Sequence, residues 1–90
     1  MTREQQIASA WEFAEKNPEW KCNDRGQLIR PGGEARGHRG WEVLPRGKGW
    51  AAYDAAVRGA SARLRGPGGR PRLFGCPASA ARALGFDVKE

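Results

Sequence analysis

Apolar residues recur with a helical period at the start of the chain. Four of them fall at spacings of three and four residues: Ile7, Ala10, Trp11 and Ala14. This spacing predicts an amphipathic helix over residues 2–16. Thr2 and Gln5 have the separation of a capping box, in which each side chain accepts a hydrogen bond from the other residue's backbone amide. Asn17 and Pro18 follow, and they end the predicted helix because the residue before a proline avoids helical geometry.

The pattern then changes to short segments separated by turn residues. Residues 20–30 place Asn23-Asp24-Arg25-Gly26 between two apolar segments, which predicts a β-hairpin. Residues 31–40 contain a proline and four glycines, so we expect no regular element there. A third strand is predicted over residues 41–44, ended by Pro45.

Residues 50–65 fit two patterns. Trp50, Tyr53, Val57 and Leu64 lie close to helical spacing, and six alanines favour a helix over the whole segment. The alternative is a strand, because every second residue from 51 to 57 is apolar. The alanine content decides the prediction in favour of a helix.

The last third predicts a short strand over residues 72–75 and a helix over residues 77–84, with Pro77 in its first turn and Gly85 as its left-handed C-terminal cap. After that cap, Phe86 is expected to fold back over the helix. The sequence therefore predicts one small α+β domain over residues 1–90. It has an N-terminal helix, a short and mostly antiparallel sheet of three to four strands, and a C-terminal helix.

Composition limits what such a domain can do. The apolar fraction is 39%, and 14 of those residues are alanines, so the core contains few large side chains. A chain of 90 residues buries a smaller share of its surface than a larger domain does. A function carried on the surface is therefore expected rather than one inside a deep cavity.

The net charge of +6 is unevenly distributed. Residues 1–24 carry five acidic and three basic side chains, whereas residues 25–82 carry twelve basic and three acidic ones. A basic surface attracts polyanions or acidic protein surfaces, and arginine binds phosphate through two parallel hydrogen bonds. Half of the chain is Ala, Gly, Arg or Pro, however, and GC-rich coding produces that composition without selection for binding.

Nothing in the sequence predicts catalysis, a cofactor or a metal. The single histidine, His38, lies in a glycine-rich loop without a nucleophile near it in sequence. Cys22 and Cys76 lack the paired local spacing of zinc ligands, and the glycine-rich segments lack a phosphate-loop motif. Without an apolar leader or membrane span, the chain is expected to be cytoplasmic with free thiols, a disulfide between the two cysteines being the alternative.

Gly69-Arg70-Pro71-Arg72 resembles the core of the AT-hook. In that motif an extended Gly-Arg-Pro segment lies in the narrow minor groove of AT-rich DNA. The residue before Gly69 is a glycine, whereas the AT-hook has a basic residue there. The abundance of Gly, Arg and Pro in this chain favours an ordinary basic loop over the AT-hook interpretation.

Residues 49–85 carry a second resemblance. GWAAYDAAVR, a basic loop, RPRLFG and PASAARAL are similar to the order of two strands and an alanine-rich helix in the arm-binding domains of tyrosine integrases and in plant ethylene-response DNA-binding domains. Those domains place a three-stranded sheet in the major groove. The resemblance implies DNA contacts from Trp50, Arg58, Arg70 and Arg72, and it requires residues 50–58 to form a strand.

We therefore expect a non-enzymatic basic protein that binds DNA or RNA, mainly at phosphates. The expected contacts are Arg36, Arg39, Arg46, Lys48, Arg70 and Arg72, with Trp50 as a candidate for stacking on bases. The alternative is a protein inhibitor that binds an acidic or nucleic-acid-handling host complex. In general character, although not in matched residues, the chain is similar to phage and mobile-element inhibitors such as anti-CRISPR proteins.

Overall fold

The computed structural model describes residues 2–31, 40–54 and 62–90. Helix α1 spans Arg3–Lys16, and the predicted capping box at its start is confirmed. The Gln5 amide donates to Thr2 Oγ1 (3.1 Å), and the Thr2 amide donates to Gln5 Oε1 (2.8 Å). The helix ends at Asn17, whose amide donates to the Phe13 carbonyl.

The buried face of α1 is rotated relative to the predicted one. Gln6, Ala10 and Phe13 are buried, whereas Trp11 is 44% exposed. Phe13 turns inward because its ring packs edge-on against the ring of Trp20, with the ring centroids 5.8 Å apart. The tertiary partner, rather than the spacing within the helix, therefore selects which aromatic side chain of α1 is buried.

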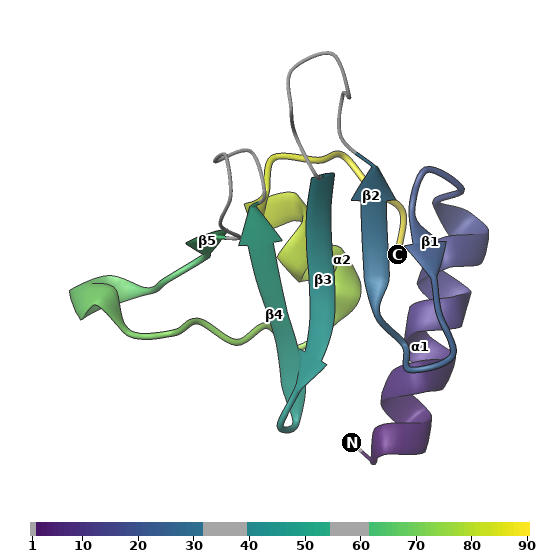
Figure 1. The fold of residues 1–90 in the computed structure, drawn as a ribbon, viewed down its shortest axis with the longest axis horizontal. Coiled ribbons are helices and arrows are strands. Elements are labelled where there is room, and N and C mark those ends of the chain that lie inside the picture. The colour runs from purple at the N-terminus through teal and green to yellow at the C-terminus, as the bar shows by residue number, and fades with distance from the viewer. Residues whose placement is uncertain (1, 32–39, 55–61) are drawn as a thin grey trace.

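Five short strands form one antiparallel sheet in the order β1-β2-β3-β4-β5 (Figure 1). The predicted hairpin over residues 20–30 is confirmed: β1 (Lys21–Cys22) pairs with β2 (Leu28–Pro31). Asn23 stabilises its turn, because Asn23 Oδ1 accepts hydrogen bonds from two amides of that turn.

Strand β3 (Gly40–Arg46) is longer than predicted, because it does not stop at Pro45. Pro45 lies opposite Trp50 in β4 (Gly49–Asp54), and the Trp50 amide donates to the Phe74 carbonyl, away from β3. Pro45 and Trp50 are therefore a non-hydrogen-bonded pair, at which no backbone amide of β3 donates to β4. A proline at this position costs the sheet nothing.

The predicted helix over residues 50–65 is wrong for every part of it that the structure describes. Residues 50–54 belong to β4, which pairs with residues 41–46 of β3, and Ala62–Arg63 form β5. Residues 55–61 lie outside the described residues. The two-residue turn at Gly47-Lys48 reverses the chain into a hairpin. Cross-strand pairing and burial of Trp50 and Ala52 thus outweigh the helix propensity of the alanines.

The predicted strand over residues 72–75 is reduced to one isolated bridge. Trp50 and Phe74 exchange both backbone hydrogen bonds, with N–O distances of 2.9 and 2.8 Å. The C-terminal helix is confirmed as α2 (Pro77–Ala83), with Leu84 as its C-cap. Gly85 follows with φ +101°, and the Phe86 amide donates to the Ala81 carbonyl, which closes the helix in a Schellman motif.

Both helices pack on the same face of the sheet, where the core forms (Figure 1). Alternation along the strands directs Leu28, Val43 and Ala52 toward the helices. The α+β class, the antiparallel sheet and the terminal helices are thus confirmed. No helix in the described parts of the chain is long and apolar enough to span a membrane.

Gly49 allows the chain at Leu73 and Phe74 to lie directly against β4. A Cβ atom on Gly49 would lie 2.7 Å from the Phe74 carbonyl oxygen, whereas a Cβ atom on Gly75 would contact nothing within 4 Å. Gly49→Ala is therefore expected to lower the free energy of unfolding by about 1–3 kcal/mol, as overpacking does. Gly75→Ala is the matched control, and urea denaturation of both variants measures the difference. Equal stabilities would contradict the close approach.

Candidate nucleic-acid interface

Beyond the β5 edge of the sheet, residues 64–72 form a two-stranded ribbon that projects from the body of the protein (Figure 1). Arg65 and Pro71 pair antiparallel. On either side of this pair, the Gly66 amide donates to the Arg70 carbonyl (2.7 Å) and the Arg72 amide to the Leu64 carbonyl (3.4 Å). We refer to residues 64–72 as the arginine ribbon.

The local sequence explains the shape of the ribbon. The tip is the 3₁₀ turn η2 (Pro67–Gly69), in which Gly68 and Gly69 have φ values of +72° and +75°, a conformation that glycine adopts without strain. Pro71 and Arg65 form a non-hydrogen-bonded pair, at which neither residue donates a backbone hydrogen bond to the partner strand. The proline therefore removes no hydrogen bond from the ribbon.

Three exposed arginines line the ribbon: Arg65, Arg70 and Arg72. The guanidinium of Arg65 donates to the Gly69 carbonyl (2.9 Å), which holds the side chain across the tip. The guanidinium carbon of Arg72 lies 4.7 Å from the centroid of the Phe74 ring, a cation–π contact at the base. A fourth arginine, Arg63, is half-buried in β5.

The arginine ribbon itself contains no acidic residue, and Asp54 lies beside its base, opposite Ala62 in the β4–β5 pair. The sequence has no aspartate or glutamate between Asp54 and Asp87. Among the described residues, the two ion pairs are Lys16–Glu12 and Arg82–Glu90, neither of which involves the ribbon. Helix α1, with its glutamates, packs near β1 at the opposite edge of the sheet (Figure 1). The ribbon guanidinium groups thus face solvent without a carboxylate partner in the described structure.

The predicted contact residues fall into three groups. Arg46 and Lys48 are exposed at the β3–β4 turn, and Arg70 and Arg72 are exposed on the ribbon. The turn and the base of the ribbon are neighbours, because Gly49 lies against Leu73 and Phe74. Arg36 and Arg39 lie outside the described residues, as does Arg58 from the integrase resemblance.

The prediction of Trp50 as a stacking residue is wrong. Its side chain is 0% exposed and belongs to the core. The reason is the strand geometry of β4, which turns Trp50 toward the helices. The sequence analysis does not identify Arg65 as a contact residue, because the helix predicted over residues 50–65 places Arg65 in its last turn. The signal was present in the sequence: Gly66-Pro67-Gly68-Gly69 between arginines on both sides is a turn composition.

A cavity of about 310 Å³ lies between α1, the start of α2 and Glu90. Its lining includes Phe13, Pro77 and Cys76, whose sulfur lies 3.2 Å from Ser79 Oγ. No group of three His, Cys, Asp or Glu side chains suited to a metal occurs among the described residues.

The second cysteine, Cys22, lies outside this cavity. Burial, with a smaller effect of the nearby Asp24 carboxylate, raises the pKa of the Cys22 thiol. That direction is opposite to what an activated nucleophile requires.

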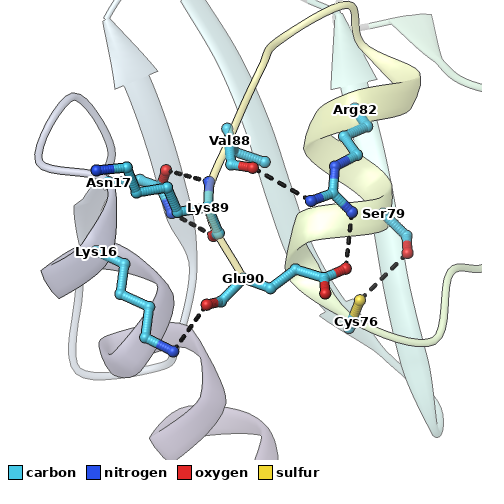
Figure 2. Close-up of polar contacts among 8 residues, drawn as sticks. All are labelled: Lys16, Asn17, Cys76, Ser79, Arg82, Val88, Lys89 and Glu90. Atoms are coloured by element: carbon cyan, nitrogen blue, oxygen red, sulfur yellow. Dashed lines mark hydrogen bonds and ion pairs between the residues drawn. The ribbon is translucent and has the colours of Figure 1, made fainter.

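Polar contacts beside this cavity fasten the last residues of the chain to both helices (Figure 2). The side-chain nitrogen Asn17 Nδ2 donates to the Phe13 and Lys89 carbonyls, and Asn17 Oδ1 accepts from the Lys89 backbone amide. On the other side, Arg82 donates to Glu90 Oε1 (2.7 Å) and to the Val88 carbonyl (3.2 Å). These contacts hold Val88, which is 7% exposed, in the core.

Asn17→Ala is expected to lower the free energy of unfolding by about 2–3 kcal/mol. Asn17 is 5% exposed, and the substitution removes three hydrogen bonds, each worth about 1 kcal/mol. The Lys89 amide and carbonyl lose the partner that the Asn17 side chain supplies, whereas the Phe13 carbonyl keeps its bond from the backbone amide of residue 17. Asn23→Ala is a control of the same chemistry at an exposed turn and is expected to cost less. Urea denaturation measures both, and a loss below 1 kcal/mol for Asn17→Ala would contradict this account.

Comparison of the chain with protein-family models, with curated proteins and with solved structures finds no match. We therefore infer the function from the geometry and charge of the described residues.

Proposed function

We propose that this protein binds nucleic acid without catalysing a reaction, and that its contact surface is the arginine ribbon together with the β3–β4 turn. The observation that carries the proposal is the set of exposed ribbon arginines, Arg65, Arg70 and Arg72, with no carboxylate partner among the described residues. Arg46 and Lys48 extend this basic surface along the adjoining turn.

The physical chemistry of these groups supports phosphates as the main target. A guanidinium group forms two parallel hydrogen bonds with a phosphate, and each phosphate that is neutralised releases condensed counterions. The acidic side chains of α1 repel a phosphate backbone, which favours an orientation in which the ribbon rather than α1 faces the nucleic acid. Affinity in this arrangement comes from charge rather than from a buried apolar surface.

Salt dependence tests the proposal. Five phosphate contacts, one for each of these basic side chains, predict a slope of about −4.5 for log affinity against log salt on duplex DNA. Fluorescence anisotropy with a labelled duplex, titrated between about 50 and 200 mM salt, measures this slope. A flat response would contradict the proposal. Capture of a host protein complex by a chain without affinity for DNA or RNA would instead support the protein-inhibitor alternative.

A further inference from the structure

The two strands of the arginine ribbon direct their arginines to opposite faces. Arg65 pairs with Pro71, so Arg70 and Arg72, one residue to either side of Pro71, lie on the other face. The contacts agree with this register. Arg72 lies over Phe74, which belongs to the core on the helix side, whereas Arg65 bends across the tip to Gly69. The ribbon thus presents guanidinium groups from both of its faces.

A projecting element with cations on both faces suits a groove with phosphates on both walls. A flat surface of DNA would satisfy the arginines of one face and leave those of the other in solvent. Inside a groove, Arg65 reaches one phosphate backbone while Arg70 and Arg72 reach the opposite one. The absence of acidic residues from the ribbon and its tip leaves no repulsive group inside the groove.

Width selects the groove. Neighbouring strands lie about 4.8 Å apart, so two strands with their backbone atoms and side chains exceed the minor groove of undistorted B-form DNA, which is about 6 Å wide. The major groove of B-form DNA, about 12 Å wide, admits a two-stranded ribbon. Gly69-Arg70-Pro71-Arg72 is extended at Arg70 (φ −73°, ψ 144°), as in an AT-hook, but the paired strand occupies the space that a minor-groove ligand needs.

We propose that the arginine ribbon enters the major groove of duplex DNA, with Arg65 and Arg70 contacting opposite walls. This inference rests on the proposed nucleic-acid function and specifies its ligand as a B-form duplex. Double-stranded RNA is excluded by the same geometry, because its A-form major groove is too deep and narrow for side chains to read.

Three labelled probes of one sequence test the ligand class: a DNA duplex of about 20 base pairs, its single strand, and the matching RNA duplex. We expect the DNA duplex to bind about tenfold or more tightly than the other two. Methyl green, which occupies the major groove, is expected to displace the protein, whereas netropsin in the minor groove is not. Displacement by netropsin alone, or equal affinity for the single strand, would overturn the groove assignment.

Single substitutions test the two faces. Arg65→Ala and Arg70→Ala are each expected to weaken duplex binding about tenfold and to reduce the salt slope by about 0.9. Arg25→Ala, an exposed arginine in the β1–β2 turn, is the matched control and is expected to leave both quantities unchanged. An effect of only one ribbon arginine would mean that one face lies flat on the DNA, which overturns this inference. Failure to bind any of the three probes would contradict the proposed function itself.

Discussion

Trp50→Ala is expected to lower the free energy of unfolding by about 3–5 kcal/mol, the cost of truncating a buried tryptophan to alanine. Trp50 is 0% exposed, and its backbone joins β4 to the Phe74 segment through two hydrogen bonds. Small domains have a total stability of about 5–15 kcal/mol, so this loss is a large part of it. Urea denaturation followed by far-ultraviolet circular dichroism measures the change, because the substitution also alters the fluorescence.

Trp11→Ala is the matched control, since it removes the same side chain from a position that is 44% exposed. It is expected to cost less than 1 kcal/mol. Trp50→Phe is expected to give an intermediate loss of stability. Trp50 Nε1 has no hydrogen-bond partner among the described residues, so this substitution reduces the buried volume without removing a hydrogen bond. Equal stabilities of Trp11→Ala and Trp50→Ala would contradict the placement of Trp50 in the core.

Simultaneous replacement of Arg65, Arg70 and Arg72 by glutamine is expected to weaken duplex DNA binding by about two to three orders of magnitude. Each charge-assisted contact is worth about 1.5 kcal/mol, which is about tenfold in affinity, and contacts on one ribbon are not fully additive. The three side chains are exposed, so the free energy of unfolding should change little. Anisotropy titrations at about 0.1 M salt measure the affinity.

The matched control replaces by glutamine three basic residues outside the ribbon: Arg3 at the start of α1, Lys21 in β1 and Arg25 in the β1–β2 turn. Both triple variants remove three positive charges from a net charge of +6, and all of these side chains are exposed. A binding mode that depends on overall charge would weaken equally in the two variants. Binding through the ribbon is expected to weaken about tenfold or less in the control. Equal losses would therefore contradict the ribbon as the contact surface.

Local signals in the sequence determined the helix ends and the first turn. The capping box of Thr2 and Gln5, the turn chemistry of Asn23 and the C-terminal cap at Gly85 are each formed within a few residues, and each is present in the structure. Capping groups satisfy backbone donors and acceptors that the helix ends leave open. Such features depend on no distant partner, which is why the sequence alone predicts them.

Most of the candidate site depended on a different kind of information. Arg70 and Arg72 were predicted from composition and motif, but the ribbon that presents them requires Arg65 to pair with Pro71 across a glycine-rich tip. That pairing requires an extended backbone at Arg65, whereas the alanines of residues 50–65 favour a helix that ends with Arg65. The role predicted for Trp50 failed for the same reason, because a strand in the middle of the sheet buries it.

The sequence by itself determined the α+β class, the helix termini, the first hairpin and the excess of arginine in the middle and later parts of the chain. Only the tertiary structure decided that residues 50–54 are a strand, that Phe13 rather than Trp11 is buried, and that the arginines of residues 64–72 stand on a projecting ribbon. The physical reason is that capping and turn formation are local. Strand pairing and the choice of buried face depend instead on partners that are distant in the sequence.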